Sequence, residues 1–65
     1  MPLSDWELWA CAREMIRQHG DDAAVRAAMR ADALAFDGAL DGAAAWRGIV
    51  RRIDALQANP AGTRH

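Results

Sequence analysis

Few side chains in this sequence could do chemistry, and Cys11 and His19 are the pair of residue types closest to a thiol nucleophile and its base. On a helix they would lie about two turns apart, and their side chains would diverge by roughly 80°. Cys11 is better interpreted as a small buried apolar residue. His19, just before Gly20, is better interpreted as a C-terminal helix residue that interacts with the last carbonyls. We therefore expect no catalytic residues and no enzymatic activity.

Metal and cofactor sites are not expected either. His19, Asp21 and Asp22 are close in sequence but lack any recognised ligand spacing. The glycine-containing segment 38–42 is not followed by the Lys or Ser/Thr of a phosphate-binding loop. The sequence therefore predicts neither a bound metal nor a cofactor.

Composition limits the protein to one small domain. A chain of 65 residues is near the lower size limit for folding without disulfides, and Cys11 is its single cysteine. A free cysteine favours the cytoplasm, and the start Met1-Pro2-Leu3 lacks the features of a signal peptide. No apolar run approaches a membrane span of about 18 residues. The net charge of −1 predicts no general attraction to nucleic acid or lipid.

Local start and stop signals predict an all-α fold. Ser4 and Glu7 have capping-box spacing, Gly20 and Gly38 are typical helix stops, and Asp41 is a candidate cap. These signals predict helices at about 5–19, 22–37 and 42–58 in a single domain, 1–58, with a frayed tail at 59–65. Short connections favour antiparallel neighbours, so we expect a three-helix up-down-up bundle, with homodimerisation as a way to complete it.

The predicted helix 22–37 is apolar nearly all round, and such a helix must be covered on more than one side. We expect its large residues Val25, Met29 and Phe36, with Leu40 after it, to join a core with the apolar faces of the other two helices. The opposite face is a ridge of smaller side chains. Either a neighbouring helix packs closely on this ridge, or it forms a homodimer contact. The ridge consists of Ala24, Ala27, Ala31 and Leu34.

Two further surfaces remain after the core is assigned. Trp6 shares the polar side of the first helix with Arg13 and Arg17, and is either a contact residue or packed across the end of the third helix. On the third helix, three arginines provide an alternative nucleic-acid face, although acidic and small residues interrupt it. They are Arg47, Arg51 and Arg52.

The chain resembles a known family in a spaced pattern of apolar and capping residues. Glu7-Leu8-Trp9 is followed by His19-Gly20, by Gly42 and by Trp46. This pattern is similar to that of a family of short, uncharacterised bacterial proteins over about residues 5 to 56. The resemblance implies a shared fold and no assigned activity.

Taken together, these features predict a small cytosolic helical module that binds protein. Its partner would be itself or a larger bacterial protein that it regulates or inhibits; nucleic acid and membrane are not expected partners. The alternative is an arginine-rich accessory protein that binds nucleic acid. Asp32 lies among apolar neighbours, so it should reach an arginine or lie at a wet interface.

Overall fold

The computed structural model describes residues 3–58, and this part of the chain is all-helical apart from short connections. Helix α1 spans Asp5–His19, the 3-10 helix η1 Gly20–Asp22, α2 Ala23–Phe36 and α3 Leu40–Gln57. Residues 5–36 are helical without a break, so α1, η1 and α2 form one sharply bent helical segment. The predicted tail, 59–65, lies outside the described residues.

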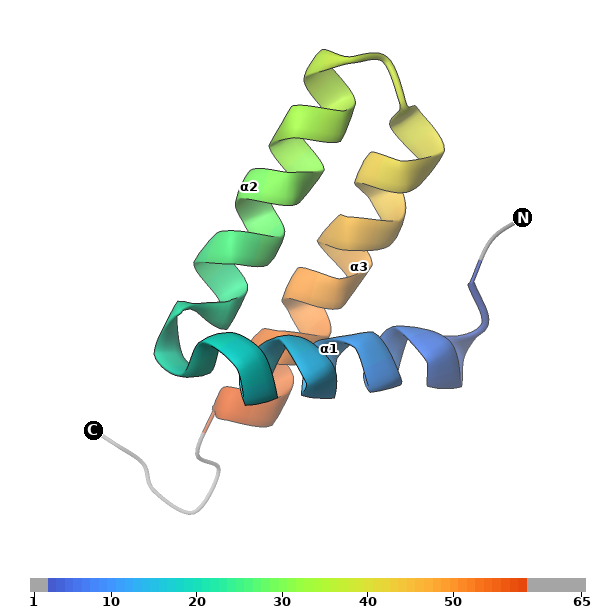
Figure 1. The fold of residues 1–65 in the computed structure, drawn as a ribbon. Helices are drawn as coiled ribbons and strands as arrows, with labels where there is room; N and C mark the ends of the chain where they lie inside the picture. Colours follow the sequence, from blue (N-terminus) through green and yellow to red (C-terminus); the bar gives the residue numbers. More distant parts are fainter. Residues whose placement is uncertain (1–2, 59–65) are drawn as a thin grey trace.

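The helices do not all run along one axis. Figure 1 shows α2 and α3 side by side as an antiparallel hairpin, with α1 lying across them. An all-helical fold is therefore confirmed for residues 3–58, but the up-down-up bundle is not. The physical reason is η1: a single 3-10 turn bends the chain at Gly20 and leaves no loop in which it could reverse direction.

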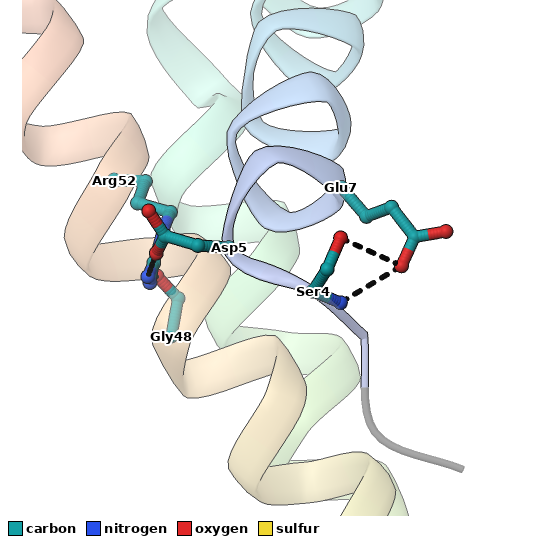
Figure 2. Close-up of polar contacts among 5 residues, drawn as sticks. All are labelled: Ser4, Asp5, Glu7, Gly48 and Arg52. Atoms are coloured by element: carbon teal, nitrogen blue, oxygen red, sulfur yellow. Dashed lines mark hydrogen bonds and ion pairs between the residues drawn. The ribbon is translucent and has the colours of Figure 1, made fainter.

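The start and stop signals of the N-terminal half lie where they were predicted. The carboxylate of Glu7 accepts hydrogen bonds from the backbone N–H of Ser4 at 2.8 Å and from its hydroxyl at 3.1 Å (Figure 2). Gly20, with φ of 57°, ends α1, and its N–H donates to the carbonyl of Ile16. These local bonds account for the agreement between the predicted and observed bounds of α1.

The α2–α3 connection is short because Gly38 takes up a left-handed conformation, with φ of 84°. The N–H of Gly38 donates to the carbonyl of Ala35, and that of Ala39 to the carbonyl of Leu34, which is a Schellman motif. Helix α3 then begins at Leu40 instead of Gly42, so Asp41 lies inside its first turn and does not cap it.

The core lies where α1 crosses the hairpin. Its large, fully buried side chains are Ile49 and Ile53 of α3, as predicted. The prediction for α2 was wrong, because Val25, Met29 and Phe36 are exposed to solvent and the buried side chains of α2 are alanines. The small side chains let α3 approach closely. The remaining core positions are alanines, namely Ala12, Ala23, Ala27, Ala31 and Ala43. Within residues 3–58, no helix is both long and apolar enough to cross a bilayer.

Candidate interaction surface

Three large apolar side chains are exposed together on the outer face of α2. Val25, Met29 and Phe36 are 60%, 63% and 92% exposed. At about 100° per residue they fall within roughly 40° of one another, so they form one stripe, which we call the α2 apolar strip. Leu40, also exposed, follows at the hairpin connection. A contiguous exposed apolar surface is a candidate site of association.

Charged side chains of both signs border this strip. Arg26, Arg30 and Asp37 lie along one edge by helical position, and Asp32 lies on the other. Asp32 is exposed and lies 3.9 Å from the guanidinium of Arg47 on α3, so it reaches an arginine. An apolar centre with a polar border is the usual composition of a protein–protein interface.

The small-residue ridge of α2 is occupied within the chain. Ala27 and Ala31 are buried, and Ala24 and Leu34 are half-buried. A Cβ at Gly42 of α3 would lie 3.3 Å from a methyl group of Leu34, which shows how closely the two helices approach. Of the two alternatives, the structure shows close packing of a neighbouring helix. The ridge therefore offers no surface to another molecule in this fold.

The patch predicted around Trp6 is only partly available. Trp6 is 69% exposed, so it does not lie across the end of α3, and Arg13 is exposed beside it. Arg17, by contrast, is engaged with Glu14, to which its Nε donates at 3.0 Å. This bond, with a second one from Gln18, lowers the pKa of Glu14 to about 2, and the same contact raises the pKa of Arg17.

The three arginines predicted as a nucleic-acid face serve different purposes. The side chain of Arg52 is 19% exposed, and it donates to the carbonyl of Gly48 at 2.9 Å and to the carboxylate of Asp5 (Figure 2). Its guanidinium also lies 5.5 Å from the ring centroid of Trp9, while its Nε is buried without a hydrogen-bond partner. Arg52 thus links α3 to α1, and its guanidinium is not free to bind a phosphate group.

Sequence reasoning missed this contact, although Gly48 provides a signal for it. Gly48 is four residues before Arg52 on α3 and is buried. A Cβ at that position would lie 3.3 Å from the guanidinium of Arg52. A buried glycine one turn before an arginine leaves space for that side chain to fold back along the helix. The other two arginines are both exposed, and the guanidinium of Arg47 lies 3.9 Å from the carboxylate of Asp32.

Neither Cys11 nor His19 is part of a reactive cluster in the described residues. Both are half-buried, and no group of three or more His, Cys, Asp or Glu within residues 3–58 could hold a metal ion. The end of α3 reaches the bend next to His19, where the amide of Gln57 donates to the carbonyl of Gly20 at 2.8 Å. This hydrogen bond connects the C-terminal end of α3 to the bend between α1 and α2.

The sequence model of one protein family matches nearly the whole chain. It is described as a family of unknown function (DUF6961), and the match covers residues 4–61. The expected membership of an uncharacterised family is thereby confirmed. No curated protein and no solved structure matches the chain.

Proposed function

The chain belongs to this family of unknown function, and we propose that it is a small cytoplasmic protein–protein interaction module. The α2 apolar strip is its binding surface. The observation that carries this proposal is the exposure of Val25, Met29 and Phe36 on one side of one helix.

The strip has the physical character of a contact surface. Its three side chains are large, they are set on a helix that the hairpin holds in place, and Phe36 is almost fully exposed. Burying each of them in a complex would contribute on the order of 1.5–3 kcal/mol. A partner on this face would also supply the outer cover of α2 that α1, lying across the hairpin, does not supply (Figure 1).

Nucleic-acid binding is the weaker interpretation of the same molecule. Arg52 is engaged within the fold, Arg47 is near Asp32, and the net charge is −1. A protein that binds phosphates needs several free cationic side chains on one face. A titration with duplex DNA, followed by anisotropy, is therefore expected to show no salt-sensitive binding.

The proposal is tested by placing a photo-crosslinking residue at position 29, on the strip, and separately at position 44, which is exposed on α3. Crosslinking in cells that produce the protein should give a defined protein adduct from position 29 and none from position 44. The adduct should disappear when Phe36→Glu is added, and circular dichroism should show that this variant is folded.

The mass of the adduct identifies the partner, which is either a second copy or another protein. Equal adducts from positions 29 and 44, or an adduct that Phe36→Glu leaves unchanged, would overturn the strip as the binding surface. In either case the exposed residues of α2 would be a solvated face.

A further inference from the structure

We infer that the occupant of the α2 apolar strip is a second copy of this chain, with the two α2 helices antiparallel across a two-fold axis. This inference rests on the proposed function and names its partner. Two features of the strip lead to it, namely its spacing and the order of charges along its edge.

The spacing of the exposed apolar residues is symmetric along the chain. Met29 and Phe36 are equally far from the point between residues 32 and 33, and so are Val25 and Leu40. An antiparallel pair of helices with its two-fold axis at that point therefore sets Met29 of one copy opposite Phe36 of the second copy. It also brings Val25 near the end of the hairpin, where Leu40 lies. A single two-fold axis thus places Met29 against Phe36 on both sides of it, and Val25 against the hairpin connection of the second copy.

The charges along one edge of the strip are arranged so that they can pair with the same edge of a second copy. Arg26 and Asp37 lie on the same edge, near opposite ends of α2, and both are exposed. In an antiparallel pair, equal edges meet, so Arg26 of one copy lies beside Asp37 of the second copy, twice. The axial offset in this register is about 3 Å, because each residue rises about 1.5 Å, and an arginine spans it easily. Opposite charges in this order favour a second copy over a partner whose surface is strongly acidic or strongly basic.

Asp32 lies beside the axis and would approach Asp32 of the second copy. Each Asp32 has Arg47 of its own chain 3.9 Å away, which offsets the repulsion between the two carboxylates. The centre of the interface therefore holds two acidic and two basic groups. The remaining repulsion weakens the dimer, and the apolar contacts and the ion pairs along the other edge have to exceed it.

The experiment uses sedimentation equilibrium on the full chain and on two charge reversals, Arg26→Asp and Asp37→Arg. The wild type should dimerise, and each reversal alone should weaken association at least tenfold, because both ion pairs become repulsive. An equimolar mixture of the two variants should associate as the wild type does, because every repulsive contact becomes attractive again. The matched control, Arg51→Asp on α3, should leave the dimer unchanged.

The two reversals are suited to the test because both should fold. Arg26→Asp places an acid in the N-terminal half of α2 and Asp37→Arg places a base at its C-terminus, and both changes agree with the helix dipole. A wild type that stays monomeric overturns the second copy as partner, while a position-29 adduct with another protein would still support the proposed function. A wild-type dimer whose mixed variants do not recover association overturns the antiparallel arrangement.

Discussion

Helices α2 and α3 pack against each other, yet they use their apolar residues in opposite ways. Helix α3 buries the large side chains Ile49 and Ile53 and leaves Arg47 and Arg51 exposed. Helix α2 buries alanines and leaves large side chains outside, among them Met29 and Phe36. The size of an apolar residue is therefore a poor guide to its direction when both faces of a helix are apolar.

The difference follows from how two helices approach. Distances between helix axes depend on the side chains at the contact, and the buried alanines Ala23 and Ala27 share one core cluster with Ile49 and Ile53 of α3. If α2 turned its large face to α3, the two helices would have to move apart. The hairpin connection at Gly38 is too short to allow much separation. The small face is buried for that reason, and the large face becomes available to a partner.

The largest expected effect is on the free energy of unfolding, which should fall much more when a buried α3 residue is truncated than when an exposed α2 residue is. Ile53→Ala should lower the free energy of unfolding by about 2–5 kcal/mol, because Ile53 is fully buried and its loss leaves a cavity. Phe36→Ala should change it by no more than about 0.5 kcal/mol in the monomer. Urea denaturation at low protein concentration measures both. Equal losses would mean that Phe36 is part of the monomer core.

The next prediction compares the two faces of α2 directly. Ala27→Leu should destabilise the fold by about 1–3 kcal/mol, because Ala27 is buried against its neighbours and the added atoms have no space. Ala33→Leu, the same substitution at an exposed position of α2, should stay within about 0.5 kcal/mol of the wild type. Thermal unfolding followed by circular dichroism, at a protein concentration low enough to keep the chain monomeric, is the measurement. If Ala33→Leu proved the more damaging variant, the orientation of α2 would have to be reversed.

These contrasts show which parts of the fold were accessible from sequence. The bounds of α1 and the stop at Gly38 were predicted because they depend on residues within one turn, such as Ser4 and Glu7. The inward face of α2 was not, because periodicity defines two apolar arcs without saying which one meets α3. The crossing of α1 depends on the tight bend at η1, which looks like an ordinary loop in the sequence.

The same distinction applies to the candidate site. Asp32 was expected to reach an arginine or a wet interface, and its ion pair with Arg47 meets that expectation. The engagement of Arg52 with Asp5 joins residues 47 positions apart, and no local pattern predicts it. The α2 apolar strip was identified as a set of residues but assigned to the core. Its role as a surface became visible only when the packing of α3 was known.

The third prediction compares two neighbouring arginines of α3. Arg52→Ala should lower the free energy of unfolding by about 1–2 kcal/mol, because it removes the hydrogen bonds to Gly48 and Asp5 and the contact with Trp9. Arg51→Ala should change it by no more than about 0.5 kcal/mol, because Arg51 is exposed. Urea denaturation of both variants is the check. Comparable losses would mean that Arg52 does not hold α1 in place.

A smaller effect concerns the centre of the strip. Asp32→Asn should tighten the dimer about threefold, since it removes the repulsion between two carboxylates near the axis while keeping their shape. Sedimentation equilibrium at low ionic strength should reveal the change, and added salt should reduce it. Weaker association of Asp32→Asn would place Asp32 against a positive group of the second copy, and so in a different register.

The smallest expected effect lies on α1, far from the strip, and depends on pH. Arg17 and Gln18 lower the pKa of Glu14 from 4.5 to about 2, so the ionised carboxylate is favoured in the folded state. A group with a lowered folded-state pKa contributes its full stabilisation above the unfolded pKa and loses it as the pH falls toward the folded value. The melting temperatures of the wild type and Glu14→Gln should therefore differ slightly at pH 6 and converge between about pH 4.5 and 2. Because this pair is solvent-exposed, high salt should shrink the difference at pH 6 as well. A difference that persisted unchanged at pH 2 would mean that Glu14 stabilises α1 through its neutral form.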